Sequence, residues 1–517
     1  MARHRKTLQP GDPLFHRDHS RPFTRRDFLR QGFISGGAAV LGGGLFSLFA
    51  NPRAAQAELS TDLQTLADSI NCTLGGLGGG KIPFICFDLA GGANIAGSNV
   101  LVGRNEPLDV LSTAGYSKLG LPGDMIPGVN EATPTATSEG DHTDLSLGLP
   151  FHSDSAFLRG ILDKVSISTA AMVNGCVIPA RSDNDTGNNP HNPMYGIAEA
   201  GGDGSVVTLI GSSNSDSGGN SMAPTSMLNS EIRPTKVDRP TDVTGMVDTG
   251  NLTGILSDPD DVVAVMESVA RISNNKLDRV TTGLTADTVV KDLMRCGYLK
   301  AADLADRFAG VNIDPAADSD IVGSSAIFRR AEFESDSEFR KTASVMKMVI
   351  DGYAGAGTIT MGGYDYHTGD RSAGELRDLR AGRCMGACLE YAARRRQPLM
   401  LYVFSDGSVS SNGMVDNSAD GRGKGVWTGD NSSTAASFFL VFSPNGRLTA
   451  LRQQIGSFSS DASVDTTSSP AANNVNLLVE TVLLNYASLN GDDFNSRFPN
   501  HGLGSQLGKL TAFSKLI

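Results

Sequence analysis

The stretch Thr358-Ile-Thr-Met-Gly-Gly-Tyr-Asp-Tyr-His367 joins a short apolar strand to a turn that carries an acidic and an imidazole side chain. Apolar residues at helical spacing precede it over 335–353, and a second helical pattern follows over 373–396. The next apolar run, 399–404, is typical of a buried strand and ends in Ser405-Asp-Gly407. Strands that alternate with helices in this way indicate right-handed crossover connections. We therefore predict an α/β fold with a mostly parallel sheet flanked by helices.

Two further apolar runs extend the predicted sheet. The first, 81–87, leads into Asp88-Leu-Ala-Gly-Gly-Ala-Asn94, and the second covers 436–442. Parallel strands place their carboxyl ends at one edge of a sheet, where the ligands of open α/β folds bind. We therefore expect the loops 88–94, 362–370 and 405–412 to share one edge and to form a functional site there.

The Asp365-x-His367 pair is the strongest chemical signal in the sequence. A carboxylate and an imidazole two residues apart, just after a strand, can face one site and bind a hard or borderline divalent cation. Asp406 and Asp88 also lie at strand ends, and they are candidates for further ligands to zinc, manganese or calcium. The alternative is that these aspartates only form turns, with His367 at the surface.

Polar loops could supply other residues of the site. Ser182, Thr186 and His191 could present a hydroxyl nucleophile beside an imidazole, although a hydrophilic turn cluster would have the same composition. Gly-x-Ser-x-Gly, P-loop and His-Glu-x-x-His patterns are absent from the sequence, which disfavours serine hydrolases, nucleoside triphosphatases and zincins. The candidate substrate-binding residues, which could equally belong to surface loops, are Asn94, Arg422 and Asp430.

The first 57 residues have the organisation of an export signal. Arg25-Arg26-Asp-Phe-Leu precedes an apolar run, Phe33–Ala50, and a small-residue cleavage site ends at Ala57. Paired arginines followed by Phe-Leu predict recognition by the twin-arginine export machinery. Cleavage after Ala57 would leave a periplasmic or extracellular protein with no stable membrane span. The alternative is a retained anchor, since the 18 residues of the apolar run are at the short end for a spanning helix.

With 517 residues, the chain is longer than one ordinary domain of ~100–200 residues. After the leader, 1–57, we predict a Gly-rich linker over 58–80 and an α/β domain over 81–517, with a loop-rich and helical insertion at about 201–335. Beyond the leader, 35 basic and 53 acidic residues give a net charge of −18, which disfavours binding to nucleic acid or anionic lipid. The six cysteines form no Cys-x-x-Cys pair, and their spacing assigns no disulfide.

Three of these stretches together carry a family resemblance. Phe87-Asp-Leu-Ala-Gly-Gly-Ala-Asn94, Gly362-Gly-Tyr-Asp-Tyr-His367 and Ser405-Asp-Gly-Ser408 resemble elements of the exported proteins grouped as domain of unknown function 1501. That family is distantly similar to alkaline phosphatases and sulfatases, and one branch of it carries a general-secretion-pathway label. The resemblance spans about 81–447 and implies an alkaline phosphatase-like fold.

The same resemblance implies roles for individual residues. In the phosphatase and sulfatase superfamily, paired metals bind an ester oxyanion while a hydroxyl or an equivalent group attacks in line. By position, Asp365, His367 and Asp406 would then be metal ligands, and Ser182 or Thr186 would be the nucleophile. The usual Asp-His-Gly element has no full counterpart here, where Gly-Asp430-Asn stands instead.

Two hypotheses about function follow. The first is an exported metal-dependent hydrolase of phosphate or sulfate esters. The second is a non-enzymatic periplasmic or surface protein with a degenerate site, which assists secretion or assembly. A third hypothesis, carbohydrate binding, is disfavoured because one tryptophan and 6% aromatic residues leave few stacking platforms.

Overall fold

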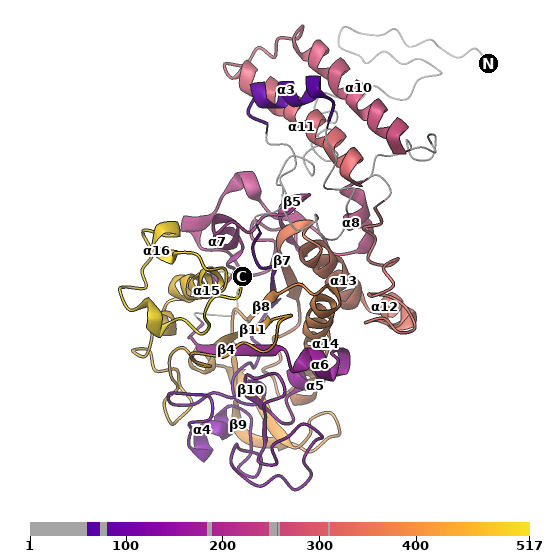
Figure 1. Ribbon diagram of the computed structural model, residues 1–517. Helices are drawn as coiled ribbons and strands as arrows, with labels where there is room; N and C mark the ends of the chain where they lie inside the picture. Colours follow the sequence, from indigo (N-terminus) through magenta and orange to yellow (C-terminus); the bar gives the residue numbers. More distant parts are fainter. Residues whose placement is uncertain (1–58, 73–79, 183–188, 248–255, 257–258, 309–310) are drawn as a thin grey trace, which may run out of the picture.

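The computed structural model describes residues 59–72, 80–182, 189–247, 256, 259–308 and 311–517 (Figure 1). In this part of the chain, a central sheet of seven strands has the order β4-β11-β8-β1-β7-β5-β6. The prediction of a mixed α/β fold with a mostly parallel sheet is confirmed. The strands of this sheet are β1 (Phe84–Leu89), β4 (Val173–Pro179), β5 (Val207–Gly211), β6 (Thr235–Lys236), β7 (Ala354–Met361), β8 (Leu399–Phe404) and β11 (Ala436–Phe442).

The centre of the sheet is parallel. Phe84 of β1 stands in register with Ala356 of β7 on one side and with Met400 of β8 on the other. Helices separate these three strands along the chain, as crossover connections require. By contrast, β11 is antiparallel to both β8 and β4, because the chain reaches it from β8 through a hairpin rather than through a crossover helix.

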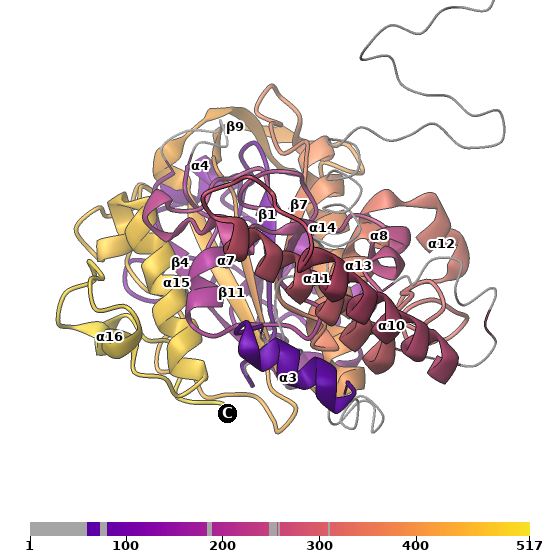
Figure 2. The same ribbon diagram turned by 90° about the horizontal axis from the view of Figure 1, so that it is seen from above.

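Helices cover both faces of the sheet, and the two cores share the strands between them (Figures 1 and 2). Ile85 and Phe87 of β1 belong to one core, whereas Phe84 and Cys86 belong to the other. This alternation explains why the strand reads as a continuous apolar run. The first face packs against α5 (Ala156–Lys164), α13 (Ser337–Ile350) and α14 (Arg371–Arg395), and the second against α7 (Met194–Glu199) and α15 (Val475–Leu489).

The predicted insertion at 201–335 contributes to the central sheet. Its strands β5 and β6 extend the sheet beyond β7, and all five residues of β5 are buried. The first part of the region predicted as an insertion therefore supplies two strands of the central sheet. The remaining part is helical and contains α8 (Pro240–Gly245), α10 (Pro259–Leu277), α11 (Asp287–Phe308) and α12 (Arg330–Ser335).

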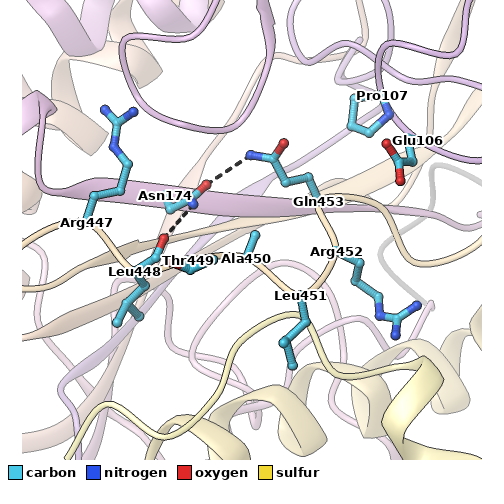
Figure 3. A pocket seen from close by; sticks show the side chains of 10 residues that line it. All are labelled: Glu106, Pro107, Asn174, Arg447, Leu448, Thr449, Ala450, Leu451, Arg452 and Gln453. Carbon is cyan, nitrogen blue, oxygen red and sulfur yellow. Dashed lines mark hydrogen bonds between the residues drawn. The ribbon is translucent and has the colours of Figure 1, made fainter.

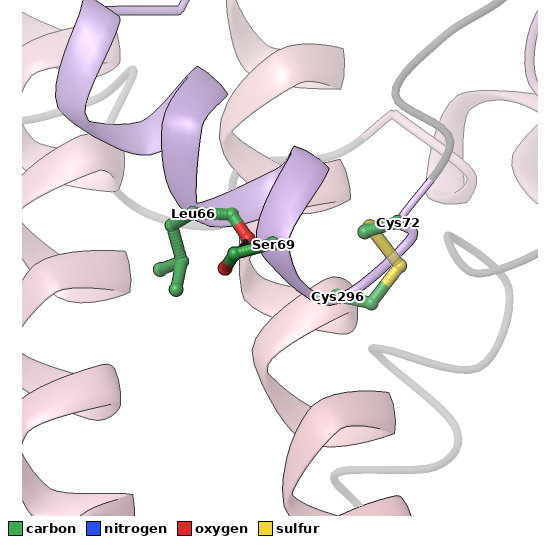
Figure 4. The surroundings of a disulfide bond; sticks show 4 residues. All are labelled: Leu66, Ser69, Cys72 and Cys296. Atoms are coloured by element: carbon green, nitrogen blue, oxygen red, sulfur yellow. Dashed lines mark hydrogen bonds between the residues drawn. A yellow bond between two sulfur atoms is a disulfide. The ribbon is translucent and has the colours of Figure 1, made fainter.

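Helices α10 and α11 pack with α3 (Thr61–Ser69) around a small core of their own. The predicted linker at 58–80 is therefore helical in part, because Leu63 and Ala67 stand four residues apart and both are buried. A disulfide joins Cys72, just after α3, to Cys296 on α11 (Figure 4). It ties the start of the described chain to the helical pair 224 residues away.

Among the residues described, no helix is long and apolar enough to cross a bilayer. The predicted leader, 1–57, lies outside the described residues.

The remaining helices and strands are α4 (Thr113–Lys118), β2 (Thr143–Asp144), β3 (Phe151–His152), α6 (Ile167–Ala170), β9 (Val409–Asp416), β10 (Lys424–Asp430) and α16 (Phe494–Arg497), besides several turns of 3-10 helix.

Candidate functional site

The loops after β1, β7 and β8 meet at the carboxyl edge of the sheet, as the sequence predicted. The amide of Ala90 donates to the carbonyl of Met361 (3.0 Å), and the amide of Tyr364 donates back to the Ala90 carbonyl (3.1 Å). Gly91 has a positive φ of 126°, and a Cβ at this position would lie 2.7 Å from the amide nitrogen of Asp365. A glycine here therefore allows the first loop to contact the loop that carries Asp365.

Asp365, His367 and Asp430 form a cluster at this edge. His367 Nε2 lies 2.6 Å from Asp365 Oδ1 and 3.7 Å from Asp430 Oδ1. The three ligand atoms lie within 4.8 Å of one another, the one such group of three or more metal-ligating side chains among the described residues. The side chains of Asp365, His367 and Asp430 are 61%, 28% and 49% exposed, respectively, so solvent reaches the cluster.

Asp365 and His367 face the same side because their neighbours are buried on the other. Tyr364 and Tyr366 alternate with them and are almost completely buried. The Tyr366 hydroxyl accepts a hydrogen bond from the Asn94 amide (2.8 Å) and lies 3.3 Å from Asp378 Oδ1, to which it donates. These contacts hold the loop in a strand-like alternation, which leaves the carboxylate and the imidazole together.

Asp430 reaches the cluster through the hairpin of β9 and β10. Its backbone pairs with that of Val409, which follows the loop after β8. Earlier in β10, the carbonyl of Trp427 accepts a hydrogen bond from the amide of Gly369 (2.7 Å). The hairpin is thus attached to the loop that contains His367. The sequence had suggested Asp430 as a substrate contact, and the structure groups it with the metal candidates.

Asp88 and Asp406 lie in a second, buried cluster. Asp88 accepts hydrogen bonds from the amides of Asn220 (2.6 Å) and Ser221 (2.9 Å) and from the Ser221 hydroxyl (3.1 Å). Asp406 accepts from the Gly91 amide (2.7 Å) and from Asn220 Nδ2 (3.1 Å). Burial raises the pKa of Asp88 to about 6, and the charge of Asp406 acts in the same direction.

This geometry separates two of the predicted metal ligands from the others. The carboxylate oxygens of Asp88 and Asp406 accept hydrogen bonds from the segment at 220–221 and from the loop after β1. Both residues are completely buried, whereas Asp365 is largely exposed. Their position is that of carboxylates that anchor loops at the edge of the sheet.

The predicted nucleophile loop is attached to the same edge at both ends. The guanidinium of Arg181 donates to the Ser432 hydroxyl (3.2 Å), and Asn189 Nδ2 donates to the carbonyl of Asp406 (2.8 Å). Ser182 is 2% exposed, and its hydroxyl has no hydrogen-bond partner among the described residues. Thr186 lies outside the described residues.

The imidazole of His191 is buried against an aromatic ring. It is 2% exposed and stacks on Phe404, with ring centroids 5.9 Å apart. Burial lowers its pKa to about 4, so the ring is neutral at pH 7. Nδ1 has no hydrogen-bond partner in the described part of the chain. His191 packs at the end of β8 and is separate from the cluster that contains His367.

Two predicted substrate contacts are engaged within the protein. Asn94 is completely buried, and its Nδ2 donates to the carbonyl of Ala96 (3.0 Å). Arg422 binds Asp154 through Nε, at 2.8 Å from Oδ1. Asn94 therefore stabilises the loop after β1. Arg422, in the turn between β9 and β10, pairs with the carboxylate of Asp154.

A pocket of about 460 Å³ lies at the opposite edge of the sheet (Figure 3). Asn174, which lines it, stands opposite Val441 in the sheet, and Val441 stands opposite Met400 near the amino end of β8. The pocket is therefore remote from the carboxyl ends where Asp365 and Asp406 lie. Its lining is Glu106, Pro107, Asn174 and residues 447–453.

Comparisons with known proteins add no relative to this description. No family model, no curated protein and no solved structure matches the chain.

Asp378, the buried carboxyl group that accepts a hydrogen bond from the Tyr366 hydroxyl, leads to a prediction about the pH dependence of stability. Burial, and then the charge of Glu375, raise the pKa of Asp378 to about 7. The folded state then holds this proton between about pH 4 and pH 7 while the unfolded chain releases it, so stability falls as the pH rises through this range. From pH 5 to pH 8, we expect the parent to lose about 2.5 kcal/mol more unfolding free energy than Asp378→Asn.

Urea unfolding at the two pH values measures this difference. The surface variant Asp163→Asn, whose side chain is half exposed in an ion pair with Arg383, serves as the control and should keep the slope of the parent. Equal slopes for the parent and for Asp378→Asn would contradict the assignment of this titration to Asp378.

Proposed function

We propose that the protein is an exported, metal-dependent hydrolase of phosphate or sulfate esters, with an alkaline phosphatase- or sulfatase-like arrangement. The observation that carries the proposal is the cluster of Asp365, His367 and Asp430 at the carboxyl edge of a parallel sheet. Ligand sites of α/β folds form at this edge. The cluster is open to solvent, so an ester substrate can reach it.

The donor set fits a borderline divalent cation. One imidazole nitrogen and two carboxylate oxygens suit zinc or manganese better than calcium, which takes oxygen ligands only. Three protein ligands also leave coordination positions for water or substrate, as catalytic metal sites require. The metal would supply a Lewis acid for the ester oxygen and lower the pKa of a bound water.

Other features support export and loop assembly around this site. Disulfides such as Cys72–Cys296 persist in oxidising compartments, in keeping with the twin-arginine signal read from the sequence. Asp88 and Asp406 bind the backbone of neighbouring loops, which gives the edge a fixed shape. Rigid support of this kind is needed to hold ligands in position.

Metal analysis of the protein from the exported fraction tests the proposal. We expect about one zinc or manganese per chain, lost in the double variant Asp365→Ala/His367→Ala. Asp430→Asn should weaken metal binding by more than the about 10–100-fold that loss of an outer-shell partner costs, because it removes the charge of a direct ligand. The exposed histidine His501, which contacts Asn495, provides a control, and His501→Ala should keep the metal.

Turnover of aryl phosphate and aryl sulfate then tests the reaction class. We expect hydrolysis of one of them that depends on the metal and is lost in the double variant. Metal binding without turnover would contradict the hydrolase assignment while leaving the metal site in place. Absence of metal from the parent, at a stability equal to that of the double variant, would contradict both.

One observation favours the second function, a non-enzymatic protein with a degenerate site. Ser182 and His191, the predicted nucleophile and its imidazole neighbour, are both 2% exposed. A hydroxyl that attacks an ester must reach the substrate. In this alternative the protein assists secretion or assembly, and turnover would be absent from the parent under all metal conditions.

A further inference from the structure

Arg377 is a partly exposed residue of α14 that lies against the loop carrying Asp365 and His367. Its guanidinium covers Gly363, since a Cβ built on that glycine would lie 3.1 Å from Nε and 3.3 Å from Cζ. The carbonyl of Arg377 accepts a hydrogen bond from the Tyr364 hydroxyl (3.1 Å). The helix and the loop are thus joined at this point, and the guanidinium has a fixed neighbour.

The guanidinium contacts the loop that carries two of the candidate metal ligands. Gly363 precedes Asp365 by two residues, so their Cα atoms are separated by about 7 Å at most. Gly363 and Asp365 are exposed, while Tyr364 and Tyr366 are buried. Arg377 therefore contacts the loop near its solvent side, at a glycine two residues before Asp365.

Arg377 also differs from the other arginines of its helix. Arg371, Arg380 and Arg383 each form an ion pair with a carboxylate. Among the residues that the structure describes, the guanidinium of Arg377 has no ion-pair or hydrogen-bond partner, while its backbone carbonyl accepts the bond from Tyr364. Its N–H donors are thus available to a ligand.

A cation at this position would reduce the repulsion between the site and an anionic substrate. Asp365 and Asp430 give the cluster a negative charge that would repel an anionic ester. A divalent cation offsets this charge, and a guanidinium beside it can donate paired N–H groups to the oxygens of a tetrahedral anion. Lysine would carry the charge but would lack the planar pair of donors.

We propose that Arg377 binds the phosphate or sulfate group of the substrate, beside the metal held by Asp365, His367 and Asp430. The proposal rests on the proposed function for the identity of this site. It adds a recognition residue for a tetrahedral oxyanion and sets the substrate class as esters with free, negatively charged oxygens.

Calorimetric titration of inorganic phosphate and of inorganic sulfate into the mature protein, with and without Mn²⁺, tests the proposal. We expect Arg377→Met to raise the Kd of the preferred anion about tenfold or more while the Kd of Mn²⁺ is unchanged. The anion Kd of Arg377→Lys should lie between those of the parent and of Arg377→Met. Arg383→Met, which removes an equal charge from an ion-paired residue of the same helix, should bind the anion like the parent.

The possible results separate this inference from the proposed function. An unchanged anion Kd in Arg377→Met would overturn the inference, as would an absence of anion binding to the parent with and without Mn²⁺. If Mn²⁺ fails to bind, the proposed function is contradicted, and the titration without metal still decides whether Arg377 binds the anion. Thermal unfolding of each variant verifies that the fold is intact.

Discussion

Glu375→Gln is expected to lower the free energy of unfolding by about 3–5 kcal/mol at pH 7. The Glu375 carboxylate accepts hydrogen bonds from Arg371 (2.5 Å), Lys424 (2.9 Å) and Arg159 (2.8 Å). Lys424 is completely buried and Arg371 is 2% exposed. Glutamine keeps the size of the side chain but removes its charge, which leaves two buried cations with too little compensation.

The pH dependence gives this prediction a second test. Burial opposes ionisation of Glu375, yet Lys424 and Arg371 outweigh it and hold the pKa below its usual value of 4.5. A lowered pKa stabilises the folded protein above that value, and the contribution disappears as the pH falls through the folded pKa. The difference between the parent and Glu375→Gln, measured by urea unfolding, should therefore shrink in acid.

An exposed ion pair provides the control for charge removal. Glu334 pairs with Arg330, and their side chains are 64% and 60% exposed. Glu334→Gln should unfold like the parent, because exposed pairs contribute little. If both variants lost the same small amount, the cluster around Glu375 would be no more important than a surface pair, and the prediction would be contradicted.

The centre of the sheet could be predicted from the sequence because it depends on local patterns. Runs such as 399–404 are apolar on both faces, and the helices between them have regular spacing, so neither needs information from distant residues. The orientation of β11 depends instead on how the β9–β10 hairpin folds back. Likewise, β5 lies in the region predicted as an insertion, because glycine and serine on both sides obscure a strand of five residues.

The candidate site was predictable where its residues are adjacent in the chain. Two-residue spacing after a strand brings Asp365 and His367 together, and the structure confirms that they face the same side. Asp406 follows β8 and Asp430 is the last residue of β10, and only the three-dimensional pairing shows that Asp430 joins His367. The burial of Asp406 depends on contacts with Asn220, which no periodic pattern predicts.

Trp427→Ala is expected to lower the free energy of unfolding by about 3–5 kcal/mol, as large aromatic deletions in protein cores do. The indole is 1% exposed, and the guanidinium carbon of Arg371 lies 4.6 Å from its ring centroid. Gly120 is also close, since a Cβ there would lie 2.6 Å from the indole. Truncation removes this packing and leaves the Arg371 charge without its aromatic neighbour.

This substitution should also affect metal binding, because Trp427 and Asp430 belong to the same strand. The carbonyl of Trp427 holds Gly369, which follows His367, so disorder in β10 would separate Asp430 from the imidazole. Trp427→Phe keeps an aromatic ring and should retain most of the stability and the metal affinity of the parent. Leu451→Ala, at a side chain that is 58% exposed, controls for loss of apolar volume. Urea unfolding and Mn²⁺ titration of the three variants measure both effects. A loss of stability in Trp427→Ala at an unchanged Mn²⁺ affinity would contradict the prediction. It would mean that the packing of Trp427 in β10 does not position Asp430.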